Sequence, residues 1–184
     1  KQTDWNRRLL GIDTLVHTAG FVHKREPMSD SEKVDAKVIN EDLVKDLAQS
    51  AVELGVKKIV FVSTIAVHGT GGTNMPVNEL TPLLPSTTYA KTKLGGENKL
   101  IQCCANSSTS WTIIRPAMVY GPNCPGNFTD LTRVVRARVP LPFKNVRNSR
   151  SFIYIENLVD LVALCIENPA ASNEIFVAAD PDAV

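Results

Sequence analysis

Short apolar runs alternate along the chain with longer segments in which hydrophobic residues recur at helical spacing. The short runs are rich in β-branched residues, as the buried strands of a parallel sheet are. The predicted strands are Thr14–Thr18, Lys58–Ser63, Trp111–Ile114 and Glu174–Val177. Because helical segments separate them, the pattern predicts an α/β fold with a doubly wound parallel sheet.

The most sharply delimited of the predicted helices lies between the first two strands. Ser29 and Glu32 form a capping-box pattern at its start, and Gly55 is a natural C-terminal stop. The other predicted helices are Tyr89–Ala105, Phe128–Arg138 and Glu156–Asn168. Loops are predicted at Gly69–Pro85, Pro116–Gly126 and Pro140–Ser149. Ligands of open α/β sheets bind beyond the carboxyl ends of the strands, so these loops are expected to surround a binding site.

Composition narrows the classes of function. The 184 residues are 43% hydrophobic, enough for one domain with a core, and a net charge of +1 gives no general attraction to nucleic acid or membranes. The four cysteines and three histidines lack metal-ligand spacing, so no metal site is predicted. No apolar run approaches the ~20 residues that span a bilayer, and the charged start does not resemble a signal peptide. We therefore predict a soluble, cytoplasmic protein.

A tyrosine and a lysine four residues apart carry the most informative chemical pattern. Tyr89 and Lys93 fall on one face of a predicted helix, a single turn apart, where an ammonium can stabilise a phenolate. Thr64 follows the second predicted strand, 25 residues before Tyr89, and its hydroxyl can hold a substrate hydroxyl. The three residues together predict a proton-transfer site for alcohol–ketone chemistry.

Six segments in a fixed order give the chain a family resemblance. They are Val16-His-Thr-Ala-Gly20, Asn40 in the long helix, Phe61-Val-Ser-Thr-Ile-Ala-Val-His-Gly69, Tyr89-xxx-Lys93, Arg115-Pro-Ala-Met-Val-Tyr-Gly-Pro122 and Arg150-Ser-Phe-Ile-Tyr-Ile155. On these segments the chain resembles the extended short-chain dehydrogenase/reductases, specifically the NAD-dependent nucleotide-sugar epimerase/dehydratase group with its Rossmann-like fold. Within that group it looks most like bacterial enzymes of surface-polysaccharide sugar synthesis.

The resemblance implies a catalytic set. Tyr89 would be the general acid/base, and Lys93 would lower its pKa and hold the nicotinamide ribose. Thr64 would hydrogen-bond the reacting hydroxyl or carbonyl. A free tyrosine has a pKa near ~10, so a shift of about three units needs about 4 kcal/mol of differential stabilisation. Asn40 would hold a water or a backbone group near the lysine, the alternative being an exposed polar position on the helix.

The resemblance also implies a cofactor and a substrate class. NAD would be the cofactor, with NADP still open because the residue that reads the adenosine ribose is not identified. Its binding residues would be Ala19, Gly20, Ser63, Tyr89, Lys93, Pro116 and Val119. The substrate would be a UDP-linked nucleotide sugar, and an arginine suits its phosphate oxygens. Its binding residues would be Thr64, His68, Asn127 and Arg150. Relatives commonly form homodimers through helices that correspond to Ser29–Leu54 and Tyr89–Ala105.

The segment that opens the family's fold is expected to be missing. A strand, a Gly-rich turn and a helix should cradle the dinucleotide pyrophosphate, and nothing before Thr14 can supply them. The C-terminal substrate lobe should also be cut short at Val184. We expect residues 1–184 to form a single partial Rossmann-like domain, with 120–170 contributing substrate-lobe segments. The isolated chain is then expected to bind dinucleotide poorly and to be inactive.

Several activities are compatible with this set of residues. A 4-epimerase returns the hydride to the other face of a rotated keto sugar, whereas a reductase delivers it to a 4-keto UDP-sugar. A catalytically silent dinucleotide-binding regulatory module is an alternative of another class, which the presence of Tyr89 and Lys93 disfavours. A ketoreductase of a non-sugar substrate is disfavoured by the Arg150 segment.

Three departures from the family pattern bear on the choice. Many relatives carry tyrosine at the position of His68, and several epimerases and dehydratases carry asparagine at that of Met118. The first change would alter the lining near the sugar. The second would remove an expected diphosphate contact and weakens assignment as a standard galactose epimerase. No acidic pair follows Thr64, since Ile65 and Ala66 stand there, so dehydration is disfavoured.

Overall fold

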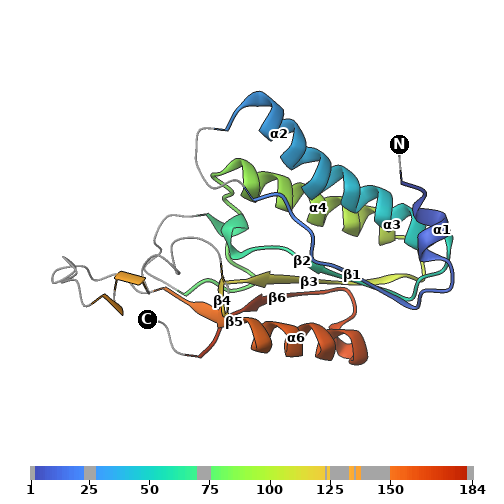
Figure 1. Ribbon diagram of the computed structural model, residues 1–184. Coiled ribbons are helices and arrows are strands. Elements are labelled where there is room, and N and C mark those ends of the chain that lie inside the picture. The colour runs from blue at the N-terminus through green and yellow to red at the C-terminus, as the bar shows by residue number, and fades with distance from the viewer. Residues whose placement is uncertain are drawn as a thin grey trace.

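The computed structural model describes residues 3–22, 28–69, 76–122, 124, 133–134, 136–137 and 150–181. Its central layer is a four-stranded parallel sheet with the strand order β1-β2-β3-β6 (Figure 1). The strands are β1 (Thr14–His17), β2 (Lys58–Val62), β3 (Ser110–Pro116) and β6 (Glu174–Ala178). Each boundary lies within two residues of the predicted one, and the predicted parallel α/β architecture is confirmed.

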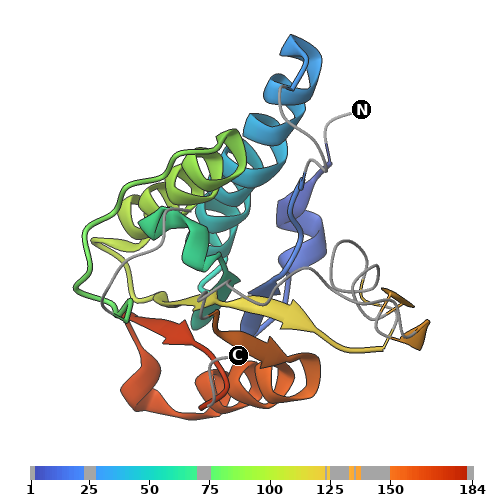
Figure 2. The same cartoon turned by 90° about the vertical axis from the view of Figure 1, so that its left-hand side faces the viewer.

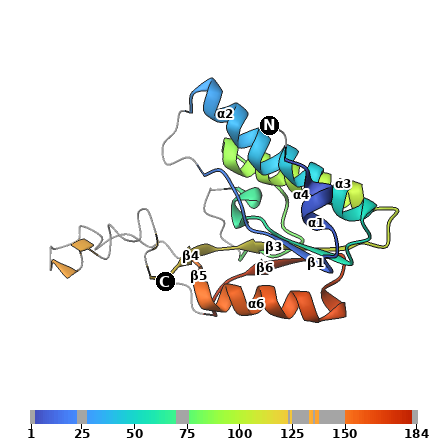
Figure 3. The ribbon, with the colours of Figure 1, turned by 45° about the vertical axis from the view of Figure 1, so that its right-hand side comes forward.

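Helices cover both faces of this sheet. On one face, α2 (Asp30–Lys37), a π-helical turn (Val38–Asp42) and α3 (Leu43–Glu53) follow one another without a break and pack beside α4 (Thr88–Cys104) (Figure 2). On the opposite face lies α6 (Ile155–Glu167) (Figure 3). The shorter elements are α1 (Trp5–Leu9) and the 3-10 turns Ile65–His68 and Pro169–Ala171.

The helical segment after β1 begins and ends where its sequence predicts. The Ser29 hydroxyl accepts the Glu32 N–H, and the Glu32 carboxylate accepts the Ser29 N–H at 2.8 Å, which completes the capping box. Beyond α3, Gly55 adopts a φ of 70°, the left-handed conformation that ends many helices. Local signals therefore define both ends of the segment.

The side chains of β2 alternate between two hydrophobic clusters. Ile59 and Phe61 pack with α3 and α4, in a cluster that includes Leu47 and Leu100. Val60 points to the other face and joins the cluster beneath α6. Because both faces of β2 are covered, its sequence is a continuous apolar run rather than an alternating one.

A buried lysine ties α6 to the sheet. Lys58, at the start of β2, donates from its ammonium to the carbonyls of Cys165 at 2.8 Å and Asn168 at 3.1 Å. These carbonyls lie at the C-terminal end of α6, where a positive charge also meets the negative end of the helix dipole. The contact fixes the helix along the strand direction.

A two-stranded parallel ribbon continues from the carboxyl end of β3. It pairs β4 (Met118–Tyr120) with β5 (Phe152–Tyr154), so the prediction of a loop throughout Pro116–Gly126 was wrong. Strands of three residues are too short to show a period of two in the sequence. The predicted helix Phe128–Arg138 and loop Pro140–Ser149 lie largely outside the described residues. In the described part of the chain, no helix is both long and apolar enough to cross a membrane.

Candidate active site

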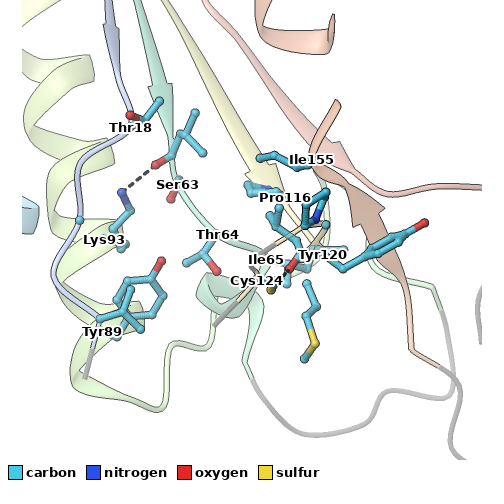
Figure 4. A pocket seen from close by; sticks show the side chains of 18 residues that line it. Thr18, Ser63, Thr64, Ile65, Tyr89, Lys93, Pro116, Tyr120, Cys124 and Ile155 are labelled. Carbon is cyan, nitrogen blue, oxygen red and sulfur yellow. Dashed lines mark hydrogen bonds between the residues drawn. The ribbon is translucent and has the colours of Figure 1, made fainter. Parts of the chain in front are cut away.

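A cavity of about 780 Å³ opens beyond the carboxyl ends of β1, β2 and β3 and is bounded on one side by α4 (Figure 4). Since the three strands are parallel, the residues that follow each of them meet at the same edge of the sheet. This edge is where the sequence predicts binding. The predicted site residues that line the cavity are Gly20, Ser63, Thr64, Tyr89, Lys93, Pro116 and Val119.

Tyr89 stands in the first turn of α4. The Thr87 hydroxyl caps this helix by accepting the Ala90 N–H at 3.1 Å, which fixes where the helix begins and hence which side chains face the cavity. The Tyr89 hydroxyl is directed toward Thr64 (Figure 4). Burial raises the pKa of Tyr89, and the nearby Thr64 side chain opposes that rise.

Lys93 lies one turn further along α4 and is 1% exposed. Its ammonium donates to the Val62 carbonyl at 2.7 Å (Figure 4) and sits 4.1 Å above the ring of Phe61. Burial lowers the pKa of Lys93 to about 8, and the negative charge of Glu97 partly offsets this by raising it. Lys93 is not among the causes of the pKa shift of Tyr89 in this structure, and its lowering of that pKa stays a prediction. The ammonium is held against the end of β2, and burial of the phenol is the larger effect on Tyr89.

The end of β2 presents two adjacent hydroxyls in different ways. Thr64 has an extended backbone with a φ of −159°, caps the following 3-10 turn, and accepts the Ala66 N–H at 3.2 Å. Ser63 is buried and donates a short hydrogen bond to the carboxylate of Glu97. Thr64 is thus the hydroxyl available to a ligand, while Ser63 is committed to the protein.

Asn40 lies in the π-helical turn and is fully buried. Its amide oxygen accepts the Phe21 N–H at 2.7 Å, and its amide nitrogen donates to the Phe21 carbonyl and to the Thr92 hydroxyl, both at 3.0 Å. The alternative of an exposed polar position is therefore wrong. Asn40 clamps the segment that follows β1 onto α4, and it does not line the cavity.

Three other predicted residues lie away from the cavity lining. Ala19 and Arg150 are exposed and do not line it. His68 is buried, with its ring nitrogens 3.0 Å from the Thr81 carbonyl and 3.1 Å from Arg115 Nη1. His68 therefore does not line this cavity, and the predicted direct contact with substrate is replaced by an indirect one through Arg115. Asn127 lies outside the described residues.

The structure adds a buried ion pair that the sequence predictions did not include. Arg115 on β3 donates to Glu97 on α4 through Nε at 3.1 Å and Nη2 at 2.7 Å, and the two side chains are 3% and 1% exposed. Two signals were available: Glu97 follows Lys93 by one helical turn, and Arg115 interrupts an apolar strand. Further lining residues outside the predicted set include Thr18, Tyr120 and Cys124.

The cavity suits an organic ligand with both an apolar ring and hydroxyl groups. Val62, Pro116 and Val119 supply apolar surface, while Tyr89 and Lys93 supply polar groups at one wall. Within the described ranges, no group of three or more histidine, cysteine or acidic residues could hold a metal ion.

Comparison with known proteins identifies relatives along most of the chain. Residues 1–179 match the family described as the NAD dependent epimerase/dehydratase family. A UDP-glucose 4-epimerase of Vibrio cholerae is 34% identical over 180 residues, which are 97% of this chain and 55% of the relative. An N-acetyl-alpha-D-glucosaminyl-diphospho-ditrans,octacis-undecaprenol 4-epimerase of Escherichia coli O157:H7 is 28% identical over 93% of this chain and 50% of the relative.

A solved structure shows the same fold. UDP-glucuronic acid 4-epimerase from Bacillus cereus, in complex with UDP-glucuronic acid and NAD, matches with a TM-score of 0.86 at 22% identity. The match covers 100% of this chain and 59% of that one. The chain thus spans about half the length of the curated relatives it matches, 55% and 50% for the two above.

Proposed function

The chain belongs to the NAD-dependent epimerase/dehydratase family, and from that premise we propose that it takes part in inverting the configuration at C4 of a UDP-sugar by reversible hydride transfer. The observation that carries the proposal is the convergence of the Tyr89 hydroxyl and Thr64 at the cavity wall (Figure 4), with Lys93 one turn along α4. Two hydroxyls that face each other at a cavity wall can both contact one substrate hydroxyl, an arrangement that suits proton transfer.

The residues present fit a bound dinucleotide, which would supply hydride acceptance and a cationic ring. Gly20 lines the cavity, and a Cβ there would lie 3.5 Å from Asn40 Oδ1 and 3.8 Å from Lys93 Nζ, so the backbone passes close to the ammonium. Lys93 would hold the nicotinamide ribose, and Pro116 and Val119 would pack on the ring. Ala19 and Ser63 are the remaining residues proposed to bind the dinucleotide. Ser63 would contribute because it lies at the end of β2.

The chain's own residues would handle the proton. Thr64 and Tyr89 would hold the C4 hydroxyl, and Tyr89 would take its proton and later return it. Because burial raises the pKa of Tyr89, the neutral phenol is the stable form in this structure, and abstraction requires added positive charge near the hydroxyl. Lys93, one turn away, is the protein's source of that charge.

The proposed substrate is held by its diphosphate. The two curated relatives above are both named as 4-epimerases, and each name contains a sugar joined through a diphosphate. Arg150 and Asn127 are the proposed diphosphate contacts, with residues 120–170 contributing to the substrate lobe. His68 would act through Arg115 rather than by contact. A role in the synthesis of surface polysaccharides fits such a substrate.

The test grafts this chain into the Vibrio cholerae relative in place of the matched 180 residues. Proton NMR then follows UDP-galactose and UDP-N-acetylglucosamine without added reduced cofactor. Formation of the C4 epimer supports the proposal. Consumption of reduced cofactor on a 4-keto UDP-sugar without C4 inversion would replace the epimerase with a reductase. The isolated 184-residue chain is expected to show no turnover, and robust activity from it would overturn that expectation.

A further inference from the structure

A buried polar network lies directly behind the cavity wall. Ser63 at the end of β2, Glu97 on α4 and Arg115 on β3 are 4%, 1% and 2% exposed. The Glu97 carboxylate accepts hydrogen bonds from the Ser63 hydroxyl and from two nitrogens of Arg115. Three elements of the fold are thus joined at a single carboxylate, immediately beside Thr64.

The network continues to the loop above the sheet. A guanidinium can only donate, so the contact of Arg115 Nη1 with His68 Nε2 at 3.1 Å requires His68 Nε2 to be an acceptor. The proton of the neutral ring then sits on Nδ1 and is donated to the Thr81 carbonyl at 3.0 Å. His68 therefore holds the outer face of Arg115 and keeps the guanidinium oriented toward Glu97.

Glu97 also lies one turn from Lys93 on α4. Tyr89, Lys93 and Glu97 follow one another at intervals of four residues and share a helix face. The other titratable or charged side chains around Lys93 are His17 from β1, which burial and Lys93 keep neutral with a pKa of about 4, and Arg115 behind Glu97. Among these described groups, Glu97 is the carboxylate that raises the pKa of Lys93 and so opposes the effect of burial.

We propose that Glu97 is a positioning residue of this site, which holds Ser63 at the end of β2 and supplies the negative charge that keeps Lys93 protonated beside Tyr89. Arg115 and His68 hold Glu97 in place. The catalytic meaning of this role rests on the proposed function, since it matters only if Lys93 and Thr64 serve the reaction. The electrostatic role itself can be measured without turnover.

The consequence of removing the charge follows from the buried cluster. The Glu97 carboxylate pairs directly with Arg115 and acts on Lys93 through its charge, one helical turn away. In Glu97→Gln the two cations would remain without it, and Lys93 is the one that can release a proton, because a guanidinium stays charged. The pKa of Lys93 should then fall further below its value of about 8.

The experiment is a pH titration of the 184-residue chain labelled with 13C,15N-lysine, in which the Lys93 signal is assigned by its loss in Lys93→Arg. Glu97→Gln should lower the pKa of Lys93 by about one pH unit or more. Ser63→Ala removes a hydrogen bond but no charge and should leave that pKa nearly unchanged. A merely structural role would loosen the packing, admit water and move the pKa of Lys93 up toward 10.5. An unchanged or raised pKa in Glu97→Gln therefore overturns the proposal.

A second comparison covers the case in which Glu97→Gln does not fold, since a buried charge without its partner can unfold a domain. Arg115→Gln and Glu97→Gln/Arg115→Gln differ only at Glu97, and the double variant contains neither member of the pair. Adding Glu97→Gln should again lower the pKa of Lys93, and no change would contradict the proposal. Failure of C4 inversion in the grafted enzyme would leave this titration unaffected, so the two proposals fail separately.

Discussion

Among single residues, Lys93 combines deep burial with a charge that the proposed chemistry needs. Burial lowers its pKa from the ordinary 10.5 to about 8. In the unfolded chain Lys93 stays protonated up to about pH 10.5. Below pH 8 it is protonated in the folded chain as well, so folding carries the whole free-energy cost of burying the ammonium. This cost disappears as the pH rises from 8 to 10.5. The shift corresponds to about 3 kcal/mol, a large part of the stability of a typical domain.

Lys93→Met tests this cost. The free energy of unfolding of the unaltered chain, taken relative to Lys93→Met, should rise by up to about 3 kcal/mol between pH 8 and pH 10.5. Urea titrations at a series of pH values measure the difference. Titration of the cysteines occurs in both proteins and cancels. A difference that is independent of pH would show that the buried ammonium is not destabilising.

The spacing of the proposed catalytic pair could be predicted from the sequence, whereas the partners of its supporting groups could not. The four-residue spacing of Tyr89 and Lys93 places them together by local geometry alone. The partners of Glu97 come from β2 and β3, and only the tertiary fold brings them to the helix. The contact of His68 with Arg115 also depends on the tertiary fold, since the two positions are 47 residues apart.

At the scale of elements, the contact between α4 and the π-helical turn depends on two adjacent glycines. At Gly96 an added Cβ would meet the backbone carbonyl of Asn40, which cannot move without disturbing the clamp on Phe21. At Gly95 it would lie 2.7 Å from the end of the flexible Glu41 side chain. The same substitution should therefore have different effects at the two positions.

Gly96→Ala should lower the free energy of unfolding by about 2 kcal/mol or more, because backbone must shift to admit the methyl group. Gly95→Ala, its matched control, should change stability by less than about 1 kcal/mol, since the higher helix propensity of alanine offsets the displacement of Glu41. Chemical denaturation of the two variants in parallel measures both. Equal losses would mean that the close packing at Asn40 is not specific to Gly96.

How well each strand or helix could be predicted depends on its burial, its length and how far apart in the sequence its partners lie. β2 was predicted to within one residue because both of its faces are covered and its run is apolar throughout. β4 and β5 were missed because their pairing depends on segments more than 30 residues apart and each strand has three residues. The π-helical turn at Asn40 likewise follows from packing against α4, which no local signal in α2 or α3 contains.

At the scale of the whole molecule, parallel strands bring four distant segments to one edge of the sheet. The segments after β1, β2 and β3 and the first turns of α4 surround the cavity, and α6 supports the sheet from the opposite face (Figures 1 and 4). Homodimer formation through the helices on the α4 side of the sheet stays a prediction. This arrangement gives the proposed function a single residue on which it depends most, Tyr89.

The most direct measurement is the rate of C4 inversion, followed by proton NMR, in the grafted enzyme with Tyr89→Phe. Loss of the hydroxyl removes the proposed proton donor and acceptor, and the rate should fall by about 100-fold or more while the fold is kept. Tyr154→Phe removes a hydroxyl from a tyrosine outside the cavity lining and serves as the matched control, with a rate close to that of the unaltered enzyme. An undiminished rate in Tyr89→Phe would contradict the account.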